Sequence, residues 1–478
     1  MDRPYDYLIV GSGAGGSAAA YRLALSGKRV LLLEKGERLP RDGSTLDPDT
    51  VLRQGTFKNH EAWEDGGGKT VFPQEYYNVG GKTKWYGAAL LRFAPHEFGA
   101  EADYGCLPWP IEYQDLEPYY TEAEQLLGTR HFPIEPQFGR IVARLTNGPG
   151  WQSQPMPLGL MLDIAADAGE ASHFDGFASV KGLKFDAEQA FLGRITAPNF
   201  TLVTGKAVSE LLAHPDGRRI QGVACADGSR YQAEVVLLAA GALHSPRLLQ
   251  HYVERAGLTA ALPGAGLIGR YYKCHLNTAL LAFSRHRKTD LLCKTALLRH
   301  ADFPHSSVQP LGGALEGDIL SGELSPWVPH RLCAGLGHHA YGFFLTTEDA
   351  SAADNRVVSE GNGTLHPRLD YQRRRIPKAA AEHRAFVGRF RRALLRSGFV
   401  SFARAMPLEA TAHACGTLVT GADPARSVVD RNGRVHGLEN LYVVDGSVLA
   451  RSSRVNPSLT IYAWALRTAA GLEPGGHA

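Results

Sequence analysis

The chain has 478 residues, long enough to bury a large core, and its 51 basic and 48 acidic side chains leave a formal charge of only +3. Hydrophobic residues make up 44% of it, and its 53 glycines and 27 prolines stay below the share that is typical of low-complexity chains. These values exclude disorder, collagen and coiled coil for the chain as a whole, argue against a nucleic-acid-binding surface, and favour a small ligand of little charge.

The first predicted elements are a strand, a helix and a second strand, which together make a βαβ unit. Residues 7–10 are apolar and stop at Gly11, and the Ala- and Leu-rich residues 14–25 have a helical period. Residues 29–33 form the second strand. The near-continuous apolar character of both strands is typical of a parallel sheet that is covered on both faces.

A glycine-rich turn joins this first strand to the helix and has the GxGxxG pattern of a dinucleotide-binding loop. Gly11 allows the tight turn, Gly13 lets the backbone approach a pyrophosphate, and Gly16 permits close packing of helix on strand. Glu34, at the end of the second strand, is placed to accept hydrogen bonds from a ribose. FAD and NAD share this chemistry, so the turn predicts a dinucleotide without choosing between them.

Two further glycine-rich stretches need separate interpretation. Residues 79–83 read Val-Gly-Gly-Lys-Thr, a loop whose backbone amides could cradle a pyrophosphate or a flavin. Residues 264–269 repeat the GxGxxG string, but a proline precedes it and no apolar strand leads into it. We therefore interpret the second GxGxxG string as a turn.

The middle of the chain predicts more of the first sheet, a second sheet and a long helix. Residues 235–239 and 441–444 are apolar runs that extend the parallel sheet. An antiparallel sheet is expected between about 277 and 370, from strands at 278–283, 307–312, 339–346 and 356–359. Residues 373–396 carry many arginines among apolar residues, which favours the solvated face of an amphipathic helix over a nucleic-acid patch.

Near the C-terminus, a histidine and an asparagine stand in patterns that suit alcohol oxidation. Asn456 precedes Pro457 and an apolar run, which predicts a helix that starts with Asn456 at or beside its N-cap. Removal of a hydroxyl proton while hydride leaves the carbon requires a base of near-neutral pKa, such as His413, and an asparagine can orient the hydroxyl. By composition alone, one histidine among 19 is more often a packed or surface residue.

The cysteines and the longest apolar run bear on location and metal binding. The six cysteines show no Cys-x-x-Cys pair, which argues against a disulfide framework or a zinc site and favours reduced thiols. The longest apolar run, 235–243, is too short to span a bilayer, and no leader precedes the first strand. We expect a cytoplasmic protein without a metal or a membrane contact.

Five stretches together resemble the glucose-methanol-choline (GMC) family of FAD-dependent oxidoreductases, in the family's order. They are residues 5–36, 76–127, 235–250, 264–277 and 411–467. They include the first two glycine loops, an Ala-Ala-Gly-Ala-Leu-His-Ser-Pro-Arg-Leu-Leu run and a His-Ala-Cys-Gly-Thr box. The combination is specific for the family, though not for a substrate.

The resemblance implies an α/β fold with two domains that are interleaved along the chain. A Rossmann-like FAD-binding domain would be built from the discontinuous segments 1–90, 195–276 and 405–478. An α+β substrate-binding domain, with an antiparallel sheet over the flavin, would be built from 91–194 and 277–404.

The resemblance also implies the roles of single residues. His413 would be the catalytic base, with Asn456 as its partner, and hydride would pass to flavin N5. The residues implied to bind the cofactor are Gly11, Gly13, Ala14, Gly16, Glu34, Gly80, Gly81, Thr83, Asp445, Gly446, Asn456, Pro457, Ser458 and Leu459. Some relatives attach the flavin covalently through a histidine after the second glycine loop, and here Trp85 stands at that position. Non-covalent FAD is therefore expected.

The implied substrate is the hydroxyl group of a sugar, an aminosugar or a polyol, with oxygen or another electron acceptor. Residues 79–90 and the histidine box are most similar to bacterial sugar and aminosugar oxidases of the paromamine 6′-oxidase type. A cationic aminosugar would need carboxylates at the pocket. By region the candidates are Asp302, Glu348, Asp349 and Glu409, with surface solvation as the alternative for each.

Three alternatives stay open at this stage. A non-redox lyase of the hydroxynitrile lyase type would keep the fold and use FAD only as a structural group. A non-catalytic flavoprotein would retain the cofactor without turnover. Cys415, beside the histidine, could be a nucleophile or form a flavin adduct, although a small buried side chain beneath the site is favoured.

Overall fold

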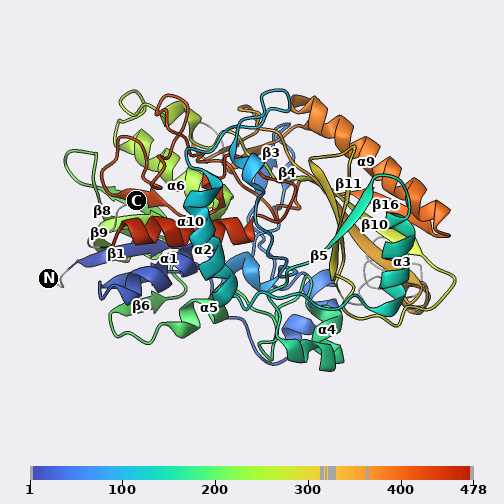
Figure 1. The fold of residues 1–478 in the computed structure, drawn as a ribbon. Coiled ribbons are helices and arrows are strands. Elements are labelled where there is room, and N and C mark those ends of the chain that lie inside the picture. Colours follow the sequence, from blue (N-terminus) through green and yellow to red (C-terminus); the bar gives the residue numbers. More distant parts are fainter. Residues whose placement is uncertain (1–3, 313–316, 318–319, 321–329, 362–364, 474–478) are drawn as a thin grey trace.

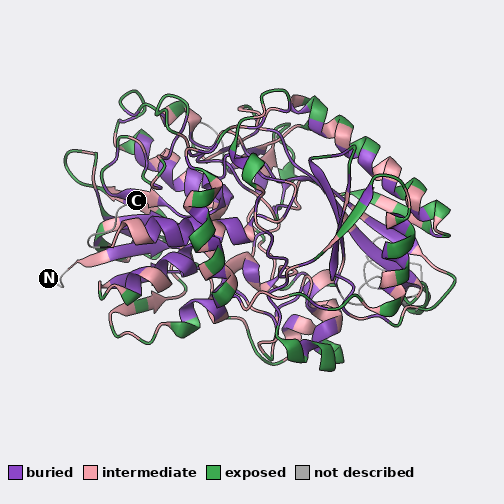
Figure 2. Cartoon of the chain, in the orientation of Figure 1, coloured by how far each residue is buried: buried purple, intermediate pink, exposed green. Residues whose placement is uncertain are grey.

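The computed structural model describes residues 4–312, 317, 320, 330–361 and 365–473. Two large sheets stand apart in the view of Figure 1, one near the two labelled termini and the other beside the long helix at the opposite end. A smaller third sheet lies between them at one side. The inner strands of both large sheets are mostly buried, as Figure 2 shows.

The sheet near the termini has seven strands, in the order β6-β2-β1-β9-β8-β7, with β17 also paired to β9. These strands are β1 (Tyr5–Val10), β2 (Val30–Leu33), β6 (Phe200–Val203), β7 (Val208–Ala213), β8 (Ile220–Cys225), β9 (Arg230–Leu238) and β17 (Leu441–Val443). Strands β6, β2, β1, β9 and β17 pair in parallel, which confirms the parallel sheet expected from the four apolar runs. Strands β7 and β8 add an antiparallel edge.

The second sheet has six antiparallel strands, in the order β16-β10-β13-β12-β11-β5. They are β5 (Trp151–Pro155), β10 (Leu276–Phe283), β11 (Ala296–His300), β12 (Ser306–Pro310), β13 (Ala340–Thr347) and β16 (Val400–Ala405). Side chains of Leu298, Val308, Phe343 and Leu280 share one buried cluster, so these residues mark one face of the sheet. Because side chains alternate along a strand, Gln309 lies on the opposite face.

The expected antiparallel sheet is confirmed, except for its fourth segment. Residues 356–359 contribute β14 (Arg356–Val358) to a separate four-stranded sheet, with β15 (Arg368–Asp370), β3 (Trp63–Asp65) and β4 (Thr70–Val71). Val357 packs there with Trp63 and Leu369, and this separate small core explains why the strand leaves the larger sheet.

The arginine-rich segment forms the long helix α9 (Pro377–Arg396), which covers one face of the six-stranded sheet (Figure 1). It begins four residues later than predicted, because Pro377 takes the first helical turn and 373–375 form a separate 3-10 turn. Ala379, Phe386 and Phe390 are among its buried residues, so the arginines belong to the solvated side of an amphipathic helix.

The other described α-helices lie around the sheets, and the N-terminal ends of α1 and α10 border the candidate site described below. They are α1 (Ala14–Leu25), α2 (Tyr113–Leu126), α3 (Pro136–Thr146), α4 (Ala168–His173), α5 (Ala187–Ala190), α6 (Gly241–Arg255), α8 (His330–Gly337) and α10 (Ser458–Gly471). Helix α10 packs against α1 and α2, which places the two ends of the chain against each other. Among the described helices, none is both long and apolar enough to cross a bilayer.

The strands of the seven-stranded sheet come from 5–33, 200–238 and 441–443, and those of the six-stranded sheet from 151–155 and 276–405. The exact domain boundaries stay a prediction.

Candidate active site

Two glycine loops that are far apart in the sequence meet at the start of α1. The Gly80 amide donates to Ser12 Oγ over 3.1 Å, and a Cβ built on Gly81 would lie 3.1 Å from Gly13 Cα. A Cβ on Gly13 itself would meet no heavy atom of the described residues within 4 Å. The two loops therefore border open space at a helix N-terminus, which is a suitable place for a pyrophosphate.

The glycines around this space are tightly packed on the protein side. Gly11 has φ +100°, which L side chains rarely adopt, and a Cβ on Gly16 would lie 1.9 Å from the Gly11 carbonyl oxygen. A Cβ on Gly15 would lie 1.8 Å from the Val444 carbonyl oxygen. The start of α1, where Ala14 is the first residue, therefore lies directly against the loop that follows β17.

Glu34 is buried at the end of β2 and connects the first glycine loop to the residues after the strand. One carboxylate oxygen accepts from the Ser12 amide (2.9 Å) and hydroxyl (2.6 Å), and the other accepts from the Gly36 amide (2.9 Å). Burial raises the pKa of Glu34 above its ordinary value. A carboxylate has about four acceptor positions, so a ribose contact remains compatible with these bonds and stays a prediction.

Thr83 stabilises the second glycine loop, and Lys82 connects it to the histidine box. The Thr83 hydroxyl donates to the Gly80 carbonyl (2.6 Å) and accepts from the Ala187 amide (2.9 Å). The Lys82 ammonium lies 2.5 Å from Glu75 and donates to the Thr411 carbonyl over 2.8 Å. The loop is thereby held next to the segment that carries His413.

Asp445 uses its carboxylate inside the protein. One oxygen accepts from the Gly241 amide (2.8 Å) and the Ser245 hydroxyl (2.5 Å), and the other accepts from the amide and hydroxyl of Ser447. These four bonds fill the acceptor positions of the carboxylate. Asp445 therefore ties the start of α6 to the loop after β17, and a contact with the cofactor would have to come from the backbone of Asp445 or Gly446.

The predicted helix at the C-terminus is α10, and it places Asn456 just before its first turn. Pro457 occupies the N-cap position, Ser458 is the first helical residue and Leu459 is fully buried. Asn456 is thus beside the N-cap, within the range predicted. The helix itself is anchored by Trp464, whose indole donates to the Val443 carbonyl over 3.0 Å.

The structure brings His413 and Asn456 together. The Asn456 amide nitrogen lies 3.3 Å from His413 Nε2, although 43 positions separate the two residues in the sequence. Desolvation lowers the pKa of His413 well below its ordinary value, and the neighbouring His275, Lys294 and Lys82 lower it further. His413 is therefore a neutral imidazole at neutral pH and can accept a proton.

Two residues that the sequence analysis did not single out contact this pair. His275 Nδ1 lies 2.9 Å from His413 Nδ1, and the Gln309 amide nitrogen lies 2.5 Å from Asn456 Oδ1. Gln309 lies on β12, and His275 immediately precedes β10. Residue type and spacing carry no signal for such a contact, although His275 falls within the 264–277 stretch that resembles the family.

Two side chains on which the sequence analysis had specific expectations are packed in the interior. Cys415 is fully buried, and burial raises the pKa of its thiol to about 12, which is the property of an unreactive core residue. Trp85 is buried, stacks on Tyr76 with 4.9 Å between ring centroids and donates from its indole to Asn78 over 3.0 Å. Neither side chain presents a nucleophile.

The four candidate carboxylates divide into two kinds. Glu348 and Asp349 are buried, so the alternative of a solvated surface carboxylate is wrong for both. Glu348 forms an ion pair with Arg451 (2.7 Å). Asp349 accepts hydrogen bonds from the Cys274 amide (3.1 Å) and the Tyr371 hydroxyl (3.0 Å). Burial raises the pKa of Asp349 to about 7. Asp302 is exposed and lies 3.4 Å from Arg389 on α9, and Glu409 is partly exposed. A contact of any of the four with substrate stays a prediction.

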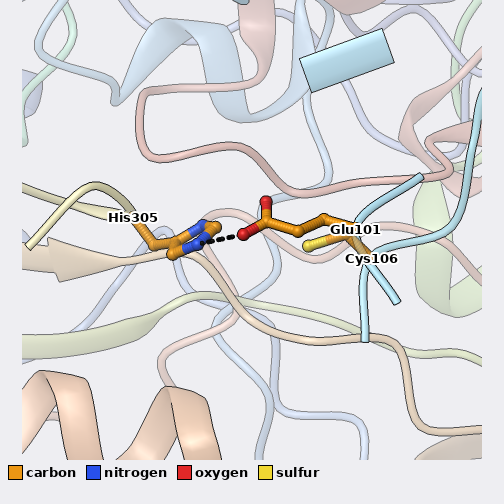
Figure 3. A group of neighbouring side chains, drawn as sticks. All are labelled: Glu101, Cys106 and His305. Atoms are coloured by element: carbon orange, nitrogen blue, oxygen red, sulfur yellow. Dashed lines mark hydrogen bonds and ion pairs between the residues drawn. The ribbon is translucent and has the colours of Figure 1, made fainter. Parts of the chain in front are cut away.

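Figure 3 shows a cluster of Glu101, Cys106 and His305, whose potential ligand atoms lie within 4.8 Å of one another. His305 faces carboxylates from both nitrogens, Glu348 at Nδ1 and Glu101 at Nε2, each at 3.0 Å. Burial alone would lower the pKa of His305, but the hydrogen bond and charge of Glu348, with the charge of Glu101, raise it. A ring that donates from both nitrogens has no lone pair for a metal, so ion pairing explains this cluster.

Comparison with known proteins gives consistent results for the whole chain. Two family models, both described as GMC oxidoreductase, match residues 5–276 and 366–465. The 6‴-hydroxyparomomycin C oxidase of Streptomyces lividus and the paromamine 6′-oxidase of Streptomyces fradiae are each 30% identical, over 98% of this chain and 91% of their own length. A solved structure of an Aspergillus oryzae formate oxidase variant, in which FAD modification was studied, has a TM-score of 0.71 at 13% identity and covers 98% of both chains.

Proposed function

The chain belongs to the GMC oxidoreductase family of FAD-dependent enzymes, and on this premise we propose that it oxidises a hydroxyl group of a sugar, an aminosugar or a polyol to a carbonyl. The observation that carries the proposal is the pair of His413 and Asn456, which are partly buried and lie 3.3 Å apart, with Asn456 in the loop before α10. The similarity to oxidases of aminoglycosides favours an aminosugar substrate.

The fit of FAD to the chain rests on the two glycine loops. The open space beside Gly13, bordered by Gly80 and Gly81 and followed by the N-terminus of α1, accommodates the pyrophosphate. Glu34 would hold the adenosine ribose, and the loop before α10 would lie along the flavin. With Trp85 buried and stacked on Tyr76, we propose that FAD is bound non-covalently.

His413 and Asn456 supply the proton chemistry of the reaction. Bound FAD supplies the acceptor for the hydride that leaves the alcohol carbon. The neutral His413 accepts the hydroxyl proton at Nε2, and the Asn456 amide donates to the same oxygen and orients it.

Rapid anaerobic mixing tests the proposal directly. Purified enzyme is mixed without oxygen with glucose, glucosamine, paromamine or glycerol, and the loss of flavin absorbance is followed. Bleaching by one of these alcohols supports the proposal, and carbonyl release without bleaching would instead identify a lyase. His413→Ala should retain FAD and lower the rate of bleaching by about 10² or more.

His383→Ala is the matched control for this experiment. His383 is another histidine whose pKa is lowered by desolvation, but it contacts Thr278 and Thr347 and belongs to the buried face of α9. This variant should bleach at a rate close to that of the wild type. Equal rates for wild type and His413→Ala would remove His413 from the role of base.

Two further parts of the proposal concern the location of the protein and its electron acceptor. The six cysteines are free and buried, which supports a reducing, cytoplasmic location. The electron acceptor is oxygen or another oxidant, and oxygen consumption during turnover distinguishes the two.

A further inference from the structure

His275 stands at one end of a continuous chain of hydrogen bonds that runs through both residues of the proposed active site. Its Nε2 lies 3.0 Å from the Ser452 carbonyl oxygen and 2.8 Å from the Ser453 carbonyl oxygen. Its Nδ1 lies 2.9 Å from His413 Nδ1. Beyond His413 the chain continues through Asn456 to Gln309.

The two backbone carbonyls determine where each proton in this chain lies. A carbonyl oxygen only accepts hydrogen bonds, so His275 must carry a proton on Nε2. Burial lowers the pKa of His275, so the ring is neutral and its Nδ1 is a lone-pair acceptor. The proton between the two rings therefore belongs to His413 Nδ1.

The same reasoning then fixes the reactive face of His413. A neutral imidazole with its proton on Nδ1 has its lone pair on Nε2, which is the nitrogen that faces Asn456. Asn456 must present its amide NH₂ to that nitrogen, and its carbonyl oxygen then accepts from Gln309. The Nε2 lone pair, which a base needs for the hydroxyl proton, thus points to the amide that orients the substrate.

The backbone around His275 is held in an uncommon conformation. His275 and its partner Ser453 have φ values of +65° and +63°, in the left-handed region that non-glycine residues rarely adopt. The Ser453 hydroxyl donates to Glu97 over 2.6 Å, and its amide lies 3.3 Å from Glu348. A strained backbone of this kind persists only where many surrounding contacts hold it in place. Such strain is concentrated at functional sites.

We propose that His275 is a positioning residue that holds His413 in the tautomer with its proton on Nδ1 and its lone pair on Nε2. This inference rests on the proposed function, because it assigns His413 the role of base. After His413 accepts a proton, its Nδ1–H continues to donate to the neutral His275 ring, and this hydrogen bond stabilises the imidazolium. His275 itself does not contact the reacting atoms in this proposal.

Two amide substitutions separate this role from a structural one. In His275→Asn, the amide oxygen takes the place of Nδ1 and continues to accept from His413, and asparagine tolerates a positive φ. In His275→Gln, the amide nitrogen takes the place of Nε2 and continues to donate to the two carbonyls, but the acceptor for His413 is lost. We expect flavin reduction by paromamine to stay within about fivefold of wild type in His275→Asn and to fall by about 10² in His275→Gln.

A role limited to the hydrogen bonds with Ser452 and Ser453 would reverse this order, because glutamine keeps those bonds and asparagine does not. FAD content and KM for the alcohol should stay close to wild type in both variants, so that the loss appears in kcat. Equal rates in the two variants, or a faster His275→Gln, would overturn the proposal.

Nitrogen NMR of the holoenzyme provides a readout that does not depend on turnover. With ¹⁵N-labelled histidine, the His413 signals are identified by their loss in His413→Ala. We expect a protonated Nδ1 and an unprotonated Nε2 in the wild type and in His275→Asn, and a mixture of tautomers in His275→Gln. An unprotonated Nδ1 in the wild type would refute the proposal, and this measurement decides the matter even if no tested alcohol reduces the flavin.

Discussion

The two GxGxxG strings of this chain offer a matched test of where the cofactor binds. Gly13 and Gly266 are the middle glycines of the two strings, and neither has a positive φ. A Cβ on either residue would meet no heavy atom of the described residues within 4 Å. Alanine at each position therefore fits the protein without FAD, so Gly13→Ala and Gly266→Ala should both fold with a melting temperature close to wild type.

The two variants should differ in their affinity for FAD. At Gly13 the new methyl group occupies the space that we assign to the pyrophosphate, between the loops that meet at Ser12 and Gly80. Overpacking a filled site by one methyl group costs about 1 to 3 kcal/mol, which corresponds to a dissociation constant about 5- to 150-fold higher. Gly266 lies in a turn far from these loops in sequence, and its substitution should leave the affinity unchanged.

Titration of apoprotein with FAD, followed by the change in flavin fluorescence, measures both dissociation constants. Thermal unfolding of the same apoprotein samples checks that the fold is intact. An unchanged affinity in Gly13→Ala, with an unchanged melting temperature, would refute the assignment of the pyrophosphate. Weaker binding in Gly266→Ala would show that the second string is more than a turn.

Three further predictions follow from the burial of particular groups. Because the pKa of His413 is well below its ordinary value, kcat/KM for the alcohol should show no acid limb with a midpoint at or above pH 6.5, and such a midpoint would contradict the proposed base. Burial lowers the pKa of His383 to about 3. Below pH 6.5 the unfolded chain therefore binds a proton at this residue that the folded chain does not. The free energy of unfolding of the wild type should fall by about 1.4 kcal/mol per pH unit from this group as the pH is lowered. The melting temperatures of wild type and His383→Gln should therefore converge between pH 6.5 and 5, and parallel curves would contradict the reasoning. Gly15→Ala should fail to give soluble folded protein, because its Cβ would lie 1.8 Å from the Val444 carbonyl oxygen, and a stable soluble variant would show that the loop moves aside.

Features that depend on neighbours along the chain were predicted well. Near-continuous apolar runs locate β1 and β2, a helical period locates α1, and the Asn-Pro pair locates the start of α10. Boundaries were less accurate where a proline shifted the first turn, as at Pro377. These features are local because hydrogen bonds within a helix and side-chain alternation within a strand involve residues close in sequence.

Sheet membership was harder to predict than the strands themselves. The segment at 356–359 is a strand, as expected, but its partner is β15 rather than the six-stranded sheet. A strand's pattern reports that one face is buried, and it does not report which core covers that face. The small core around Trp63 decides the matter here.

The amino-acid sequence by itself determined the βαβ unit, the family resemblance and the residues His413 and Asn456, because each depends on local patterns or on stretches that can be matched one by one. Only the tertiary structure decided that His275, 138 positions from His413, contacts its ring, and that Gly13 rather than Gly266 borders the second glycine loop. Those relations arise when strands of different sheets and the loops between them pack together, and a contact between distant side chains is set by that packing rather than by the spacing of residues along the chain.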